Sequence, residues 1–191
     1  MVGVMRHAFA VLLLSCAPAW AACPPSADVG EAAAAVIERL RAAPDARAAQ
    51  RISGDLWRLW TRAPDERAQA LLDEGMGRRE AFDLPGAARA LDALVAYCPD
   101  YAEGWNQRAF VAFLRGDHEA ALPDLDRALA LRPRHVAALS GRGLTLIALG
   151  RIVEGQDDIR AALALNPWLA ERRYLSLDPL TGRPRPPQTD L

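Results

Sequence analysis

Apolar residues recur every three or four positions along most of the chain, in blocks separated by glycine, proline or aspartate. This spacing places apolar side chains on one face of a helix. Two helices are predicted over residues 29–43 and 46–62, and Asp45 and Asp65 are candidate N-caps of the helices that follow them. The predicted fold class is all-α. Six more helices are predicted over residues 68–81, 84–98, 102–114, 118–131, 136–148 and 152–165.

The helical blocks repeat with a fixed period. Pro99, Pro133 and Pro167 lie 34 residues apart and divide the chain into the windows 68–101, 102–135 and 136–169. Each window holds two predicted helices, and a proline that cannot continue a helix closes it. Small residues recur at two positions in each window, where two helices must cross closely. They are Gly75, Ala109 and Gly143 at the first position, and Ala87, Ala121 and Gly155 at the second.

The central window resembles the tetratricopeptide repeat family. Its signature residues are Trp105, Ala109, Gly116, Ala121, Leu125, Ala128 and Pro133. The resemblance covers the three windows, and it implies an α-α superhelix in which stacked helix pairs bury their apolar faces against their neighbours. More loosely, the segments YAEGWNQRA and RPRHVAALSGRGL are similar to exported tetratricopeptide proteins of unassigned role from Gram-negative bacteria.

The flanks are expected to finish the stack. Residues 22–66 are interpreted as an N-terminal arm and a capping helical hairpin, followed by the repeats over residues 67–169. Residues 170–191 are expected to form a short capping helix and, from Ser176, a proline-rich disordered tail. The hairpin is predicted to pack onto the first repeat through Ile52, Leu56, Leu59 and Trp60, with Trp57 as a further candidate.

The resemblance also implies a binding surface, because in this family the first helix of each unit lines the concave face of the arc. The residues at those positions are apolar in the middle and polar at the entrance, which suits a peptide with apolar anchors. The alternative is that Phe110, Phe113, Leu144 and Ile147 pack against one another or against the next helix. The candidate groove residues are Leu72, Met76, Arg79, Glu80, Glu103, Asn106, Phe110, Phe113, Leu144 and Ile147.

Residues 1–21 have the pattern of a secretory signal peptide. Arg6 and His7 precede an apolar run over residues 8–14, and small residues at A-x-A spacing follow, so cleavage is expected after Ala21. The alternative is a lipoprotein signal in which Cys16 becomes the lipidated N-terminus. The expected location is the periplasm, with a membrane contact only if Cys16 is lipidated.

Export would leave Cys23 and Cys98 in an oxidising compartment. The sequence leaves two possibilities open, a disulfide that ties the N-terminal arm to the repeats or two unpaired thiols, because spacing alone does not bring two Cα atoms together.

Composition excludes some partners and disfavours catalysis. The 23 basic residues nearly balance the 24 acidic ones, so nucleic acid is not an expected partner. His118 and His135 occupy helix starts without a metal-ligand or triad pattern, and pairs such as Asp124 and Asp126 are expected on solvated faces. We therefore predict a non-enzymatic scaffold without cofactor, metal or small-molecule substrate, which binds another envelope protein or peptide. The alternatives are a lipid-anchored assembly subunit and an accessory subunit of an enzyme.

Overall fold

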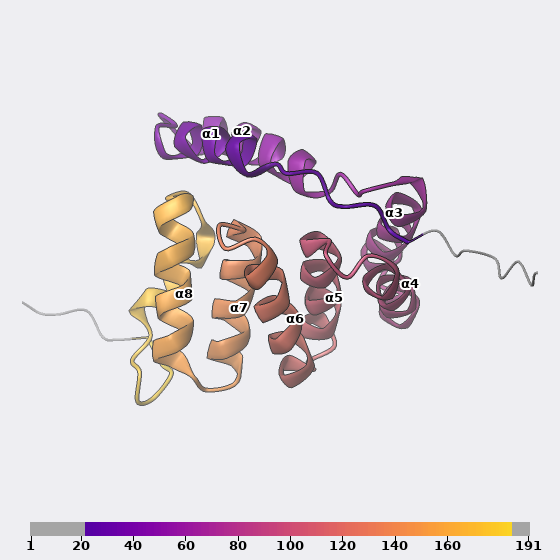
Figure 1. Cartoon of the computed structure of the whole chain (residues 1–191). Coiled ribbons are helices and arrows are strands. Elements are labelled where there is room, and N and C mark those ends of the chain that lie inside the picture. The colour runs from indigo at the N-terminus through magenta and orange to yellow at the C-terminus, as the bar shows by residue number, and fades with distance from the viewer. Residues whose placement is uncertain (1–21, 185–191) are drawn as a thin grey trace, which may run out of the picture.

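The computed structural model describes residues 22–184, which form an arc of stacked helix pairs (Figure 1). The expected signal peptide, with Cys16 and the cleavage site at Ala21, lies outside the described residues. Within the described range the structure is all-α, as predicted. Its elements are α1 (Gly30–Arg41), α2 (Ala46–Trp60), α3 (Glu66–Glu80), α4 (Leu84–Tyr97), α5 (Ala102–Leu114), α6 (His118–Leu131), α7 (Val136–Ala148), α8 (Ile152–Leu165) and the 3-10 helix η1 (Ala170–Ser176).

Aspartate side chains cap four of these helices, α2, α3, α4 and α6. The carboxylates of Asp45 and Asp65 accept hydrogen bonds from the backbone N–H groups of Ala48 and Ala68, so both predicted N-caps are confirmed. The Ala68 N–H first, and then the Tyr97 hydroxyl, hold the pKa of Asp65 below its usual value. These caps satisfy N–H groups that have no partner inside the helix.

Each repeat is an antiparallel pair whose helices meet at the small residues. A Cβ on Gly75 would lie 2.7 Å from the Leu91 side chain, and a Cβ on Gly143 would lie 2.8 Å from the carbonyl oxygen of Gly155. The small residues therefore set the distance between the two helices of a pair, as the sequence predicts.

Gly155 gives a direct test of this packing. A Cβ there would lie 2.5 Å from the Gly143 carbonyl oxygen, so we expect Gly155→Ala to destabilise the fold by about 1–3 kcal/mol despite the better helix propensity of alanine. Gly77→Ala is the matched control, because no atom lies within 4 Å of its Cβ position and alanine should stabilise α3 by roughly 0.5–1 kcal/mol. Urea unfolding of both variants measures the difference. Equal stabilisation by the two substitutions would contradict close packing at Gly155.

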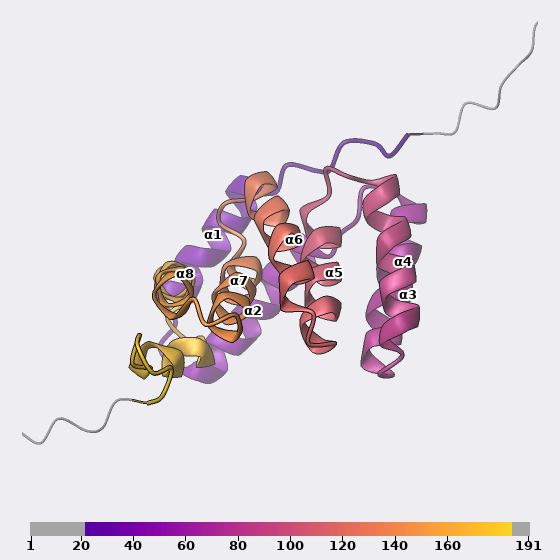
Figure 2. The same ribbon diagram turned by 90° about the horizontal axis from the view of Figure 1, so that it is seen from below.

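The hairpin of α1 and α2 does not lie where the sequence analysis places it. It crosses the upper ends of α5 to α8 in Figure 1, and Figure 2 shows the same crossing from below. Leu56 and Trp60 belong to a core cluster with Val136 of the third repeat, and Ile52 and Leu59 pack against that cluster. The expectation that these residues pack onto the first repeat is therefore wrong.

The surface chemistry of α3 explains this difference. Its solvent-facing positions include the charged residues Arg67, Asp73, Glu74 and Arg78, which offer no apolar face to a capping hairpin. The third repeat does offer one, at the start of α7 and the end of α8, where Ala137, Leu165 and Leu169 pack against the hairpin cluster. At the tip of the hairpin the Trp168 indole N–H donates to the Leu40 carbonyl at 3.2 Å.

Two arginines join successive repeats on another face. Arg108 makes a bidentate pair with Asp124 at 2.7 Å and also reaches Asp92 of the preceding repeat at 3.1 Å. Arg142 repeats the arrangement one unit later, with Asp158 and Asp126. The hydrogen bonds with Asp158, and then with Asp126, raise the pKa of Arg142.

Asp124 is consequently buried, and its expected place on a solvated face is wrong. The bidentate arginine satisfies the carboxylate where water cannot.

The C-terminal segment is folded as far as Pro184. The Gln156 amide donates to the carbonyls of Tyr174 and Leu177, and Leu177 forms an isolated β-bridge with Pro184. The expected disordered tail is therefore wrong for residues 177–184, because a buried amide on α8 holds the turn against the last repeat. The rest of that expectation concerns residues 185–191, which lie outside the described residues.

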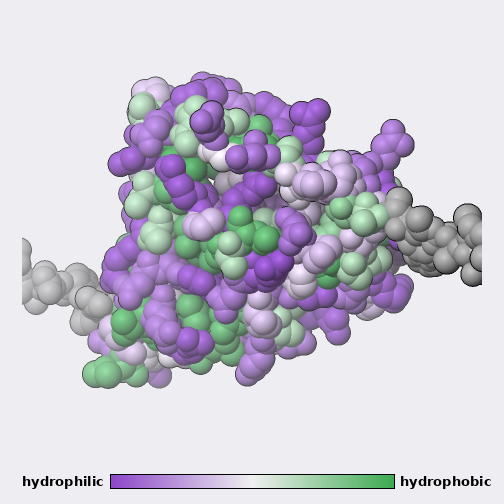
Figure 3. All heavy atoms as spheres, viewed as in Figure 1, coloured by the Kyte–Doolittle hydropathy of each residue, from purple (hydrophilic) through white to green (hydrophobic). Residues whose placement is uncertain are grey.

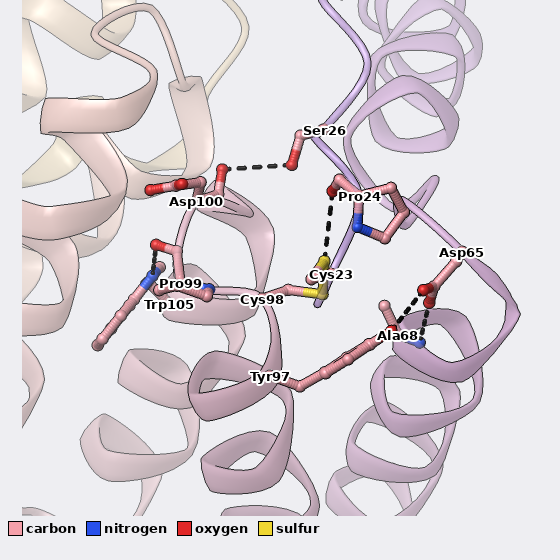
Figure 4. The surroundings of a disulfide bond; sticks show 10 residues. All are labelled: Cys23, Pro24, Ser26, Asp65, Ala68, Tyr97, Cys98, Pro99, Asp100 and Trp105. Carbon is pink, nitrogen blue, oxygen red and sulfur yellow. Dashed lines mark hydrogen bonds between the residues drawn. A yellow bond between two sulfur atoms is a disulfide. The ribbon is translucent and has the colours of Figure 1, made fainter. Parts of the chain in front are cut away.

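A disulfide joins Cys23 to Cys98, with the two Cα atoms 5.2 Å apart (Figure 4). Beside it the Ser26 hydroxyl donates to the Asp100 carbonyl at 3.2 Å. Of the two possibilities that the sequence leaves open, the structure has the bonded one. The arm that leads into α1 is thus tied to the junction of the first and second repeats.

Candidate functional site

A hollow of about 340 Å³ lies on the concave side of the second and third repeats. Its walls are mostly apolar. Phe110 and Phe113 come from α5 and Leu144 from α7, while Leu169 at the end of the third repeat and Trp57 of α2, outside the repeats, complete the walls. Small residues, Ala109, Ala137 and Gly141, leave the space open at its floor.

The surface around this region is mixed. In Figure 3 the hydrophobic colour forms small separate patches among hydrophilic residues, several of them below the hairpin. A second hollow of about 380 Å³ lies between α2 and the end of the third repeat, and it shares Trp57, Ala137 and Leu169 with the first. Trp57 therefore stands at the boundary of the two hollows.

A buried polar network lies beside the first hollow. Arg79 of α3 donates to the side-chain oxygen of Gln107, and the amides of Gln107 and Asn106 both donate to the Glu103 carboxylate. Glu103 is only 1% exposed, and its second oxygen lies 2.8 Å from Nε2 of His135. A carboxylate buried this deeply requires several donors, and the network provides them.

The hydrogen bonds of His135 assign its ring proton. Its Nδ1 accepts from the backbone N–H of Ala138, so the proton is on Nε2 and is donated to Glu103. His135 thus caps α7, as its interpretation as a helix-start residue predicts. The sequence did not indicate its complete burial or its contact with Glu103.

Trp60 covers this network from the hairpin side. Its ring stacks on that of His135 with centroids 4.0 Å apart, and the Tyr101 hydroxyl donates to its carbonyl at 2.8 Å. Burial raises the pKa of Tyr101, so the phenol stays protonated and acts as a donor. These contacts hold the end of α2 firmly against the second and third repeats.

The structure brings half of the predicted groove residues together. Those that line the hollow are Arg79, Asn106, Phe110, Phe113 and Leu144. Leu72 is instead buried in the core with Met76 packed beside it, and Glu103 is buried under Trp60. Glu80 is exposed, and Ile147 lies against Gly155 of α8. These five residues do not line the hollow.

Sequence reasoning missed the walls that lie outside the repeats. Trp57 and Glu171 line the hollow, although they belong to segments that were expected only to cap the stack. The sequence contains no signal for either residue, and only the structure shows that Trp57 is 39% exposed, as large aromatic residues at contact surfaces often are.

The arrangement suits binding by apolar contact. Within residues 22–184 no cluster of His, Cys, Asp or Glu side chains could hold a metal ion, and none of the described helices has the length and hydrophobicity that a bilayer crossing requires. The hollow is at the lower end of the size range of ligand pockets, with apolar walls and a few polar groups at its edge.

Comparison with known proteins identifies the repeat. The family model described as tetratricopeptide repeat matches residues 102–135. Tetratricopeptide repeat protein 36 of Mus musculus is 32% identical over 130 residues, which cover 66% of this chain and 70% of the mouse protein. A TPR repeat-containing protein of Rhizobium etli is 42% identical over 62 residues, which cover 32% of this chain and 30% of that protein. The chain thus spans less than a third of the length of the Rhizobium relative.

A solved structure has the same fold. The first tetratricopeptide domain of Spaghetti (RPAP3), bound to the HSP90 peptide SRMEEVD, is 24% identical with a TM-score of 0.54, over 56% of this chain and 84% of that one.

Proposed function

This chain belongs to the tetratricopeptide repeat family, and we propose that it is a non-enzymatic scaffold that binds a protein or peptide in the hollow between α5 and α7. The observation that carries the proposal is the hollow itself, whose walls are formed by Phe110, Phe113 and Leu144. Apolar side chains that remain accessible in a concave surface favour association through burial. A similar fold that holds a peptide in the Spaghetti structure supports this use of the surface.

The proposed location is the bacterial cell envelope. The signal-like pattern of residues 1–21 supports export, and the Cys23–Cys98 disulfide supports an oxidising compartment. The proposed partner is accordingly another envelope protein or peptide. The intact mass of the exported chain distinguishes cleavage after Ala21 from a lipid anchor at Cys16, which would make the protein an anchored assembly subunit.

The hollow can be tested with a charge placed on its wall. Phe110 is partly exposed at its mouth, so we expect Phe110→Glu to abolish crosslinked capture of the partner from the native envelope while the helical circular dichroism is unchanged. The loss follows from removing the Phe110 ring and from the cost of burying a carboxylate against an apolar partner.

Val153→Glu is the matched control, since Val153 is an exposed apolar residue of α8 outside the hollow. Capture that survives in Phe110→Glu, or that is lost equally in both variants, would contradict binding at the hollow.

A further inference from the structure

Trp57 differs from the other tryptophans that the structure describes. Trp60 stacks on His135, Trp105 donates to the Pro99 carbonyl, and Trp168 donates to the Leu40 carbonyl. Over residues 22–184 the side chain of Trp57 has no hydrogen bond, ring contact or cation contact, and it is 39% exposed. An indole that lacks internal partners at the edge of a hollow is available for an external one.

The position of Trp57 is nevertheless fixed. It lies one turn before Trp60, whose ring stacks on His135 and whose carbonyl accepts from Tyr101. Leu56, directly before it, is buried in the hairpin cluster. The backbone of α2 at Trp57 is therefore anchored on both sides, and only the indole is free to adjust. Such a residue can hold a ligand without the ordering cost of a mobile loop.

The groove is closed where Trp57 lies. Trp57 from α2 and Glu171 from the segment after α8 add walls to the concave surface that the repeats alone do not have. A long extended peptide that ran along the arc would meet these walls at the third repeat. The hollow's volume of about 340 Å³ is suited to one large side chain and the backbone next to it.

The charge of the hollow indicates what kind of side chain it accepts. Among the described residues that line it, Arg79 is the only cation and donates to Gln107, and Glu171 is the only carboxylate. Most of the wall is apolar, with Phe110, Phe113 and Leu144, so a charged side chain would lose hydration there. An uncharged apolar side chain does not have this desolvation cost.

One polar group in the wall is unsatisfied. The Ser140 hydroxyl is buried, with the residue 6% exposed, and has no hydrogen-bond partner in the described part of the chain. Ser140 is one of the residues that line the hollow, as is Trp57. A hydroxyl can donate or accept, so it can bond to the backbone N–H or C=O beside an inserted side chain.

We infer that the partner inserts one large uncharged apolar side chain, such as leucine or phenylalanine, between Trp57 and the wall of Phe110, Phe113 and Leu144, and that Ser140 bonds to the adjacent backbone. This inference rests on the proposed function and makes Trp57, which lies outside the repeats, a residue that determines specificity.

The test uses the exported chain with its disulfide intact, labelled with 5-fluorotryptophan, and follows the ¹⁹F resonance of Trp57, which Trp57→Phe assigns. The probes are the capped peptides N-acetyl-Ala-Xaa-Ala-amide with Leu, Phe, Ala, Glu or Lys as Xaa. We expect the Leu and Phe peptides to shift the Trp57 resonance with a Kd of about 1 mM, which corresponds to roughly −4 kcal/mol. The Ala, Glu and Lys peptides should bind at least tenfold more weakly.

Variants separate a direct contact from an indirect effect. The affinity of these variants is followed through the backbone amide of Gly141, which also lines the hollow. Trp57→Ala should weaken binding of the Phe peptide at least tenfold, and Ser140→Ala should weaken it about threefold or more. Phe82→Ala is the control, because Phe82 is 83% exposed in the turn between α3 and α4, outside the hollow. The Phe82→Ala variant should bind the Phe peptide with the affinity of the unsubstituted chain.

The inference is overturned if neither the Leu nor the Phe peptide binds at 10 mM, if the Lys or Glu peptide binds equally well, or if Trp57→Ala leaves the affinity unchanged. Binding of free indole without binding of any capped peptide would indicate a small-molecule site and would also overturn it. If capture from the envelope depends on Phe110 but not on Trp57, the scaffold function stands and this inference fails.

Discussion

Replacing Trp60 by alanine is expected to lower the free energy of unfolding by about 3–5 kcal/mol and to detach the α1–α2 hairpin from the repeats. Trp60 is 5% exposed, stacks on His135 and packs in the cluster that joins the hairpin to Val136. Its loss removes a large buried surface and also exposes the His135–Glu103 pair to water. Urea unfolding measures the stability, and amide hydrogen exchange should increase over α1 and α2 before it increases over α3 to α8.

The neighbouring tryptophan of the same helix is the matched control. Trp57→Ala removes an equal volume from a position that is 39% exposed and has no internal partner, so we expect a loss below about 1 kcal/mol. If the two substitutions cost the same, or if exchange over α1 and α2 does not change in Trp60→Ala, then Trp60 does not hold the hairpin.

Removal of the disulfide should give the second large effect. Cys23→Ala is expected to lower the free energy of unfolding by about 2–4 kcal/mol, because the bond closes a loop across 75 positions of the sequence and restricts the unfolded chain. For a chain of this size the melting temperature should fall by roughly 5–15 °C. Cys23 is the better of the two sites for substitution, since Cys98 is buried in the core of the first repeat and its replacement would add a packing cost.

A reducing agent provides the control for this measurement. Dithiothreitol should lower the melting temperature of the unsubstituted chain to nearly that of Cys23→Ala, and it should leave the melting temperature of the variant unchanged. If Cys23→Ala has the same melting temperature as the oxidised unsubstituted chain, the disulfide with Cys98 contributes nothing to stability.

The helices of the repeats could be predicted almost completely from the sequence. The helices α5, α6, α7 and α8 begin and end at the predicted residues, and α3 and α4 lie within two residues of the prediction. The reason is physical, since each repeat combines a 3.6-residue apolar period, a capping residue and small residues at a close crossing. All of these are local signals, and local signals are visible in the sequence.

The placement of the hairpin could not be predicted, because it depends on contacts between residues that are far apart in the chain. Nothing next to Trp60 in the sequence indicates that its ring stacks on His135, and Trp168 reaches Leu40 across 128 positions. The hairpin was expected on the first repeat because the two are adjacent along the chain. The apolar surface on which it packs belongs to the third repeat.

The candidate site was predicted in part for the same reason. The family positions selected Phe110, Phe113 and Leu144, which line the hollow, since these positions depend only on the phase of the repeat. The same family positions also include Leu72 and Glu103. These two residues are buried by neighbouring elements, which the repeat phase alone does not reveal. Trp57 and Glu171 could not be predicted as wall residues, because their positions depend on where the flanking segments fold.

The crossing of the hairpin has a mechanical consequence. An open stack of helix pairs behaves as a curved spring, because each unit contacts only its neighbours and small rotations between units add up along the arc. Here α2 runs from its connection with the first repeat to the third as a strut, and the disulfide clamps the arm that precedes it. A force that pulls the repeats apart must therefore separate Trp60 from His135 before the arc can lengthen. The width of the hollow is then set by a rigid frame rather than by the elasticity of the stack.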